Sequence, residues 1–307
     1  MVTAIPMTNG LAQNVIADGI HRFACKKRGK MMDFDDAYAN IAHIANADRF
    51  VLGWPEKAAA FRDSWPQKQL DIAYGDDPRH CFDLFLPKVQ ATGLVVFLHG
   101  GYWRAFAKDD WSHLAAGALS RGFAVALPSY RLAPQAALDE ICQDVAVAVA
   151  AAANYIDGPI HLVGHSAGGH LVTRLISGMP LLSPELINRI VAVTSISGVH
   201  DLRPLLFTKL NELLAITDRI AITESPTLLV PLPSVQAGQI AVSLWVGAEE
   251  RPEFLRQTDL LAVSWGGLGV PVTVKHEKGR HHFDVIDGLA IPTSNLIGVV
   301  LGNSNIN

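Results

Sequence analysis

A serine flanked by glycines is the strongest chemical feature of the sequence. Gly164, Ser166 and Gly168 form the pattern G-x-S-x-G. This pattern is typical of a nucleophile elbow, a sharp strand-to-helix turn that exposes the serine hydroxyl. An apolar run at residues 160–163 leads directly into the pattern, and a helical pattern follows directly after it. Ser166 is therefore the candidate nucleophile, and the alternative is an ordinary glycine-rich turn with a capping serine.

A second glycine-rich loop, His99-Gly100-Gly101-Tyr102-Trp103, follows the apolar run at residues 94–98. Acyl transfer creates an oxyanion, which needs preorganised donors such as backbone N–H groups. We expect one donor from Gly100 or Gly101 and another from Ala167, the residue after the candidate nucleophile. The sequence does not decide between the two glycines. The alternative is a tight turn with two buried aromatic residues.

The candidate general base lies in the segment Gly279-Arg280-His281-His282-Phe283-Asp284, after the last predicted strand. The chain order of this architecture is serine, then acid, then histidine. We choose His282, with His281 as the second candidate. An exposed polar loop is the alternative for this pair. A metal site is disfavoured because no third ligand occurs at a suitable spacing.

The candidate acid follows the preceding predicted strand, in the segment Gly247-Ala248-Glu249-Glu250-Arg251-Pro252. Either glutamate has the chemistry to orient the histidine and to stabilise its imidazolium form. By position we favour Glu250 over Glu249. The glutamate that is not used is expected to be a solvated loop charge.

Four other histidines, at positions 161, 165, 170 and 200, are expected to serve packing or local hydrogen bonds. The sequence contains no Walker-type loop, no G-x-G-x-x-G, no zinc-type Cys/His spacing and no H-E-x-x-H. Nucleotide-dependent and metal-dependent enzymes are therefore disfavoured, and we expect no cofactor and no metal.

Alternating strand and helix patterns must position these residues. Strands are expected at residues 70–74, 81–86, 94–98, 123–127, 160–163, 190–196, 240–246 and 270–275. Helices are expected at residues 33–63 with a break at Trp54-Pro55, and at 138–155, 167–176, 253–265 and 291–301. Residues 224–239 are expected to form a long surface loop. The alternation predicts an α/β fold, with a mostly parallel central sheet and helices on both faces.

Composition limits the class of protein. The chain has 307 residues, a hydrophobic content of 50% and a formal net charge of -4. Disorder and a nucleic-acid-binding surface are disfavoured by these values. No apolar run is long enough to cross a membrane, and three widely spaced cysteines suit reduced thiols, so we expect a cytoplasmic protein. We expect residues 1–32 to be an arm that is flexible or covers the site, and residues 33–307 to be one domain.

The sequence resembles the α/β-hydrolase superfamily, and within it the kynurenine formamidase (arylformamidase) group and related carboxylesterases. The resemblance begins near Asp33 and rests on the two glycine loops, on the acid and histidine positions, and on three further segments. These segments are Ser197-Gly198-Val199-His200-Asp201-Leu202-Arg203-Pro204, Ser225-Pro226 and Glu250-Arg251-Pro252-Glu253-Phe254. Members of the family usually have aspartate at the acid position, where this sequence has Glu250.

The resemblance implies a serine hydrolase that forms an acyl-enzyme on Ser166 and needs no cofactor. The expected substrate is a small-molecule amide or ester, such as an N-formylkynurenine-type aryl formamide, and Tyr102 and Trp103 are expected beside it. A short-chain carboxylesterase is the first alternative. A non-catalytic binding protein of the same fold and an acyltransferase are the others. We expect no nucleic-acid or membrane partner, and the sequence leaves a homo-oligomer open.

Overall fold

The computed structural model describes residues 32–302, and all of the elements below lie between Phe34 and Val300, in one compact unit. Residues 1–31 are not among the described residues, so the expected N-terminal arm at residues 1–32 stays a prediction.

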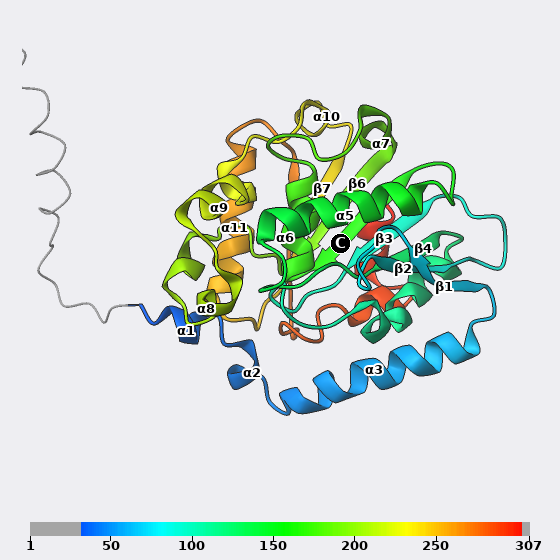
Figure 1. Ribbon diagram of the computed structural model, residues 1–307, viewed down its shortest axis with the longest axis horizontal. Helices are drawn as coiled ribbons and strands as arrows, with labels where there is room; N and C mark the ends of the chain where they lie inside the picture. The colour runs from blue at the N-terminus through cyan, green and yellow to red at the C-terminus, as the bar shows by residue number, and fades with distance from the viewer. Residues whose placement is uncertain (1–31, 303–307) are drawn as a thin grey trace, which may run out of the picture. The chain divides into compact units, whose positions relative to one another are not determined.

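The centre of this unit is an eight-stranded sheet in the order β1-β2-β4-β3-β5-β6-β7-β8 (Figure 1). The pairs β1–β2 and β2–β4 are antiparallel, and every later pair is parallel. The strands are β1 Lys68–Ala73, β2 Cys81–Phe85, β3 Leu94–Leu98, β4 Ala124–Pro128, β5 Ile160–His165, β6 Ile190–Ile196, β7 Ala241–Gly247 and β8 Val272–Glu277. The expected α/β fold with a mostly parallel sheet is confirmed.

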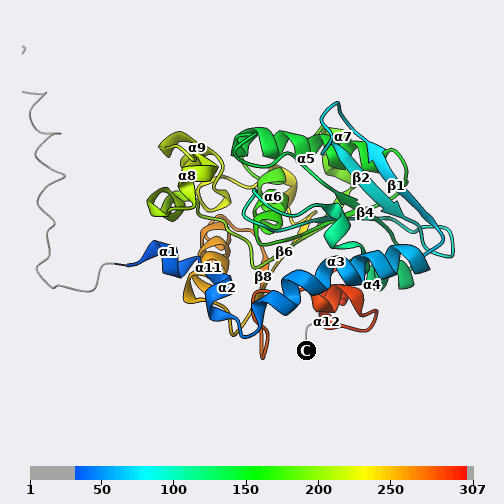
Figure 2. The same ribbon diagram turned by 60° about the horizontal axis from the view of Figure 1, so that its bottom comes forward.

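Helices cover both faces of the sheet. The α-helices are α1 Phe34–Ala37, α2 Asn40–His43, α3 Ala47–Ser64, α4 Ala116–Ser120, α5 Leu138–Ala153, α6 Ala167–Leu175, α7 Pro184–Arg189, α8 Asn211–Leu214, α9 Asp218–Thr223, α10 Pro233–Gln236, α11 Pro252–Gly266 and α12 Asn295–Val300. Figure 2 shows α5 and α6 on one side of the sheet, and α3, α4 and α12 on the other.

The strand β3 shows why two layers form. All five of its residues are buried, and they alternate between the two hydrophobic cores. Leu94, Val96 and Leu98 pack in the core beneath α5 and α6, whereas Val95 and Phe97 pack in the core beneath α3 and α12. A strand buried on both faces needs a continuous apolar run rather than an alternating one, and this is what the sequence has.

Two local expectations are wrong. Pro55 does not break the first helical region, because it lies inside the 18-residue helix α3. A proline there removes one backbone hydrogen bond, but the neighbouring Trp54 is only 2% exposed and packs against Trp111 and Phe283. Tertiary packing therefore outweighs the local penalty.

The segment 224–239 is not a plain surface loop. It contains a 3-10 turn, Pro226–Leu228, and the short helix α10. Ser225 is fully buried, accepts a hydrogen bond from the N–H of Leu202 and donates one to the carbonyl of Ala221. Pro226 and Pro233 instead begin the 3-10 turn and α10, where a proline costs no helical hydrogen bond, and Ser225 is a buried hydrogen-bonding group.

Candidate functional site

Ser166 lies at the sharp turn between β5 and α6. Its backbone has φ 55° and ψ -114°, a conformation that costs energy for a residue with a β-carbon. A β-carbon at Gly164 would overlap the carbonyl of Gly168, and one at Gly168 would overlap the carbonyl oxygen of Leu98. Both glycines are thus required by close backbone contacts. Ser166 itself is 3% exposed and lines a cavity.

His282 reaches the same cavity from the loop after β8. It is 3% exposed, and its ring packs against Phe254 and His165, with centroid distances of 4.3 Å and 4.7 Å. Its Nδ1 lies 2.6 Å from Oε2 of Glu250. The second candidate, His281, lies away from the cavity lining and pairs with Asp284 instead.

Glu250 lies in the turn after β7 and is buried. Its Oε1 accepts hydrogen bonds from the backbone N–H of Gly247, at 2.9 Å, and from the hydroxyl of Ser197. Oε2 is left to face His282. The neighbouring Glu249 is exposed. Of the two glutamates considered from the sequence, the structure brings only Glu250 to the histidine.

The backbone around Ser166 offers free N–H groups. Gly100 and Gly101 line the cavity, and a β-carbon at Gly100 would lie 3.1 Å from the Cβ of Ser166. The N–H groups of Gly100, Gly101 and Ala167 donate no hydrogen bond to any other residue between 32 and 302. Ala167 is the first residue of α6, where the backbone N–H groups have no partner within the helix. The loop and the helix thus supply unpaired backbone N–H groups on two sides of Ser166.

His99 anchors the first of these loops. Its ring stacks on Tyr130 at 4.4 Å between centroids, and the hydroxyl of Tyr130 donates to the carbonyl of His99 at 2.8 Å. The Nδ1–H of His99 donates to the carbonyl of Gly100 at 2.7 Å. Complete burial lowers the pKa of His99 to about 3, so the ring is neutral at neutral pH. Its role is to hold the shape of the loop.

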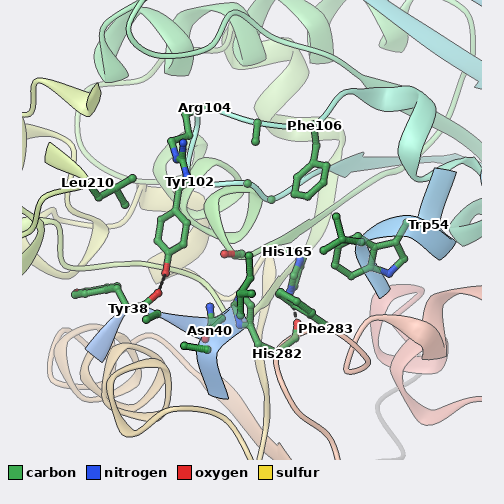
Figure 3. A pocket seen from close by; sticks show the side chains of 18 of the residues that line it. Tyr38, Asn40, Trp54, Tyr102, Arg104, Phe106, His165, Leu210, His282 and Phe283 are labelled. Carbon is green, nitrogen blue, oxygen red and sulfur yellow. Dashed lines mark hydrogen bonds between the residues drawn. The ribbon is translucent and has the colours of Figure 1, made fainter. Parts of the chain in front are cut away.

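The cavity has a volume of about 500 Å³, which is within the usual range for small-molecule sites. Figure 3 shows Trp54, Phe106 and Phe283 on one side of His165 and His282, and Tyr38, Tyr102 and Leu210 on the other. The ring of Trp54 packs against both Phe106 and Phe283, at centroid distances of 5.8 Å and 5.1 Å. The polar side chains in the lining, besides the serine and the two histidines, are Asp35, Tyr38, Asn40, Tyr102, Arg104 and Thr208.

Tyr102 and Trp103 have different positions, although both were expected beside the substrate. Tyr102 lines the cavity, and its hydroxyl donates to the carbonyl of Tyr38 at 2.8 Å. The expectation for Trp103 is not met, because Trp103 is fully buried and is absent from the cavity lining. Its ring packs edge-on against His170 in the core. Both residues have a positive φ.

The four histidines at positions 161, 165, 170 and 200 form local hydrogen bonds, as expected. Nε2 of His165 donates to the carbonyl of His282 at 2.9 Å, and burial lowers the pKa of His165 well below its usual value. His161 contacts the carbonyl of Val300, and His170 contacts that of Glu224. His200 lies 3.2 Å from the hydroxyls of Thr173 and Ser195. Among the described residues, no group of three His, Cys, Asp or Glu side chains is arranged to hold a metal.

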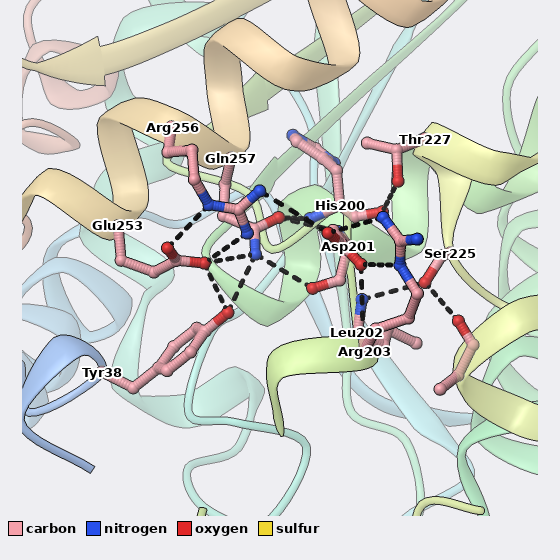
Figure 4. Close-up of polar contacts among 11 residues, drawn as sticks. Tyr38, His200, Asp201, Leu202, Arg203, Ser225, Thr227, Glu253, Arg256 and Gln257 are labelled. Carbon is pink, nitrogen blue, oxygen red and sulfur yellow. Dashed lines mark hydrogen bonds and ion pairs between the residues drawn. The ribbon is translucent and has the colours of Figure 1, made fainter. Parts of the chain in front are cut away.

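A buried polar network fixes the cavity wall formed by Tyr38 (Figure 4). The hydroxyl of Tyr38 donates to Oε1 of Glu253 at 2.6 Å and accepts from the amide nitrogen of Gln257 at 2.9 Å. The amide oxygen of Gln257 accepts from the N–H groups of His200 and Asp201. The network ties the segment around α1 to α11 and to the loop after β6.

Several lining residues were not singled out in the sequence. Asn40, Trp54 and Phe106 lie in segments without a chemical motif, so no local signal marks them. Arg104 had a usable signal, since it directly follows the loop that supplies the free N–H groups. Ser197 lies at φ 52° after β6 and belongs to a segment that the sequence marked only by resemblance.

Comparison with known proteins finds one family match and several hydrolase relatives. The family described as BD-FAE matches residues 82–185. Kynurenine formamidases of Danio rerio and Salmo salar are 28% and 29% identical to this chain, each over 73% of this chain and 77% of its own length. An isoprenylcysteine alpha-carbonyl methylesterase of Arabidopsis thaliana is 34% identical over 34% of this chain and 26% of its own length.

Solved structures show the same fold. A protein of Silicibacter sp., provisionally assigned as a thioesterase, is 45% identical with a TM-score of 0.82, over 88% of this chain and 99% of that one. A carbohydrate esterase from gut microbiota has a TM-score of 0.61 at 20% identity, over 78% of this chain and 97% of that one. No helix among residues 32–302 is long and apolar enough to cross a membrane. The chain belongs to the α/β-hydrolase superfamily, in its arylformamidase and esterase group, and is a hydrolase of the α/β-hydrolase type.

Proposed function

We propose that this chain is a serine hydrolase of the arylformamidase type, which removes a formyl group from an aryl amide through an acyl-enzyme on Ser166. One observation carries the proposal. Ser166 and His282 line the same cavity, and the Nδ1 of His282 lies 2.6 Å from the buried carboxylate of Glu250. A nucleophile, a base and a group that orients the base are the parts that this chemistry needs.

Glu250 sets the protonation pattern of His282. Its Oε2 accepts the proton on Nδ1, which leaves Nε2 unprotonated and able to act as a base. Nε2 takes the proton of the Ser166 hydroxyl while the serine oxygen attacks the formyl carbon. The imidazolium that forms is stabilised by the carboxylate, which the N–H of Gly247 holds in place.

The carbonyl oxygen becomes an oxyanion in this step. The N–H groups of Ala167 and of Gly100 or Gly101 are free to donate to it. Ala167 also begins the nine-residue helix α6, whose dipole favours negative charge at this end. Donors fixed in the backbone need no rearrangement when the charge appears.

Loss of the amine completes the acyl-enzyme, and water then removes the acyl group. The imidazolium gives its proton to the amine nitrogen, the C–N bond breaks, and the aryl amine leaves. Water then attacks the formyl ester of Ser166, with His282 again as the base. The imidazolium returns this proton to the serine oxygen as the bond between that oxygen and the formyl carbon breaks, and formate is released. The reaction needs no cofactor.

The shape of the cavity supports an aryl substrate. Trp54, Phe106 and Phe283 supply aromatic surface next to the histidines, and a planar ring packs well against such surface. The kynurenine formamidase relatives support the formyl amide in particular. The second candidate is a short-chain carboxylesterase, which the methylesterase relatives support and for which the same residues have the same roles.

The test compares two substrates and two serine variants. We expect kcat/KM for N-formyl-L-kynurenine to reach about 10⁴ M⁻¹s⁻¹ or more, and to exceed that for p-nitrophenyl acetate. Ser166→Ala should abolish turnover of both while the fold stays intact. Ser120→Ala is the matched control, since this serine is exposed and lies on α4.

Each result has a defined meaning. Turnover of the ester alone would reject the formamidase and support the carboxylesterase. Full activity in Ser166→Ala would reject the serine mechanism. A fluorophosphonate probe gives an independent check, because absence of labelling at Ser166 in folded protein would favour a non-catalytic binding protein.

A further inference from the structure

The backbone of His282 receives its hydrogen bond from the side chain of His165. Nε2 of His165 donates to the carbonyl of His282 at 2.9 Å, and among residues 32–302 this is the one hydrogen bond that the backbone of His282 makes. The neighbouring residues His281 and Phe283 use their N–H groups within their own loop. The loop after β8 is thus tied to the rest of the site at the residue proposed as the base.

His165 is also the neighbour of the proposed nucleophile. It is the last residue of β5, and Ser166 follows it directly in the turn into α6. Its side chain is buried and lines the cavity. His165 therefore joins the strand that leads to the nucleophile to the loop that carries the base, which lies 117 residues later in the chain.

The ring of His282 is held by its surroundings on more than one side. Phe254 and His165 pack against it at centroid distances of 4.3 Å and 4.7 Å, and Figure 3 shows His165 beside it. Glu250 binds Nδ1 alone, at 2.6 Å. One hydrogen bond at Nδ1 lets the ring turn about that bond, so the fixed backbone and the ring contacts are needed to set the direction of Nε2.

Ser166 and His282 do not hold each other in place. In the part of the chain that the structure describes, no hydrogen bond joins the serine hydroxyl to the histidine. Such bonds often tighten only when substrate is bound. Until then the surrounding residues must keep the two groups aligned, and a misplacement of about 1 Å can cost on the order of 10²-fold in rate.

His165 provides this hydrogen bond without adding a charge. Its proton is on Nε2, because Nε2 donates to a carbonyl, and its Nδ1 is buried without a partner among the described residues. Burial, and after it the nearness of His282, hold the pKa of His165 well below its usual value. A charged residue here would oppose the imidazolium that forms on His282, whereas a neutral donor does not.

We propose that His165 is a positioning residue for His282, and that its Nε2–H holds the backbone of the base where Nε2 of His282 can reach the hydroxyl of Ser166. The inference rests on the proposed function, since it takes Ser166 as the nucleophile and His282 as the base. It holds equally for a formyl amide and for an ester substrate. It also gives a role to the residue before the serine in G-x-S-x-G, which the motif leaves open.

The experiment separates the donated proton from the packing of the ring. His165→Phe keeps a planar ring and removes the donor, and His165→Gln restores an N–H group near the position of Nε2. The matched control is His161→Phe on the same strand, where Nδ1 donates to the carbonyl of Val300 outside the cavity lining. Each protein is assayed with N-formyl-L-kynurenine and p-nitrophenyl acetate, and its thermal unfolding is recorded.

We expect His165→Phe to lower kcat roughly 10–100-fold and to change KM less than about three-fold, because the base is misplaced while the cavity keeps its lining. His165→Gln should recover kcat to within about five-fold of the wild type. His161→Phe should lose a similar amount of stability and keep kcat within about two-fold. The downfield NMR signal of the proton between Nδ1 of His282 and Glu250 should broaden in His165→Phe and persist in His165→Gln.

A merely structural role predicts a different pattern. Equal losses of kcat in His165→Phe and His161→Phe would overturn the proposal, as would a wild-type kcat in His165→Phe or no recovery in His165→Gln. If His165→Phe does not fold, ¹⁵N NMR of the histidine rings in the wild-type protein decides. A proton on Nε2 of His165 would support the proposal, and a proton on Nδ1 would overturn it, because no donor would then face His282.

Failure of the proposed function gives other results. Turnover of the ester alone would reject the formamidase and leave the comparison of the variants intact. If neither substrate is turned over, the rate at which a fluorophosphonate labels Ser166 takes the place of kcat, and an unchanged rate in His165→Phe would overturn the positioning role. If Ser166 is not labelled, the serine mechanism fails, and an unchanged NMR signal of the proton between His282 and Glu250 in His165→Phe would overturn the positioning role as well.

Discussion

Replacing Glu250 by glutamine tests the assignment of the acid most directly. Glutamine keeps the length of the side chain and removes its charge. Its amide oxygen can still accept from Gly247 and Ser197, so the buried turn after β7 should persist. Its NH₂ group, however, would face Nδ1 of His282, where the carboxylate now accepts a proton at 2.6 Å.

The expected loss follows from this change of partner. An NH₂ group donates to Nδ1, so the proton of the neutral imidazole moves to Nε2, which then cannot accept the proton of Ser166. The imidazolium formed during attack also loses a charged hydrogen bond, worth about 1.5–3 kcal/mol. The wrong tautomer of His282 and the lost charge of residue 250 together predict a fall in kcat/KM of roughly 10²–10⁴-fold. This corresponds to a loss of ~3–5 kcal/mol of transition-state stabilisation.

The assay is kcat/KM with p-nitrophenyl acetate, next to thermal unfolding to show that the variant is folded. Glu249→Gln is the matched control, because it makes the same chemical change one residue earlier at an exposed position. We expect the control to stay within about two-fold of the wild type. Near-full activity in Glu250→Gln, or an equal loss in both variants, would refute the reasoning.

Three further predictions concern the fold. Gly168→Ala should prevent folding or lower the unfolding temperature strongly, because its β-carbon would overlap the carbonyl of Leu98; a wild-type melting curve would contradict this. Lys108→Met should cost ~3–5 kcal/mol in urea unfolding, since it leaves the fully buried Asp83 without its 2.8 Å partner, and an unchanged urea midpoint would argue against this account. Burial lowers the pKa of His200 from 6.5 to about 3, so the unfolded state binds the extra proton and stability falls as pH drops below about 6.5. The His200 ring signals in NMR should keep their neutral position down to pH 4, and a midpoint near 6 would contradict the burial.

The sequence predicted the fold well where packing follows a simple period. The expected strands at residues 94–98 and 190–196 match β3 and β6 at both ends. Buried parallel strands are continuous apolar runs between glycines and polar turns, so their limits are visible locally. Pro55 and residues 224–239 were mispredicted because their local preferences are overruled by partners far away in the chain, such as Trp111 for the helix and Leu202 for Ser225.

The residues of the candidate site also fall into those that the sequence predicted and those that it did not. Ser166 and the glycines of both loops were visible in the sequence, because tight turns restrict residue types over a few neighbouring positions. Asn40 and Trp54 were not visible, because they reach the cavity from helices α2 and α3 of the N-terminal part of the fold. Nothing in their own segments indicates a cavity. Trp103 shows the opposite error, since its place in the loop suggested a contact with the substrate, but its side chain is fully buried outside the cavity lining.

Glu250 shows how a glutamate is held beside the histidine at a position where the resemblance implies an aspartate. A glutamate reaches one methylene further than an aspartate, so the same turn would carry its carboxylate past the histidine unless something held it back. Ser197 and the N–H of Gly247 both bind Oε1, and this turns Oε2 toward His282. Ser197 occupies a left-handed backbone conformation directly after β6, the strand adjacent to β7. The segment that first appeared only as a point of family resemblance thus has a physical role, because it fixes the orientation of the longer acid.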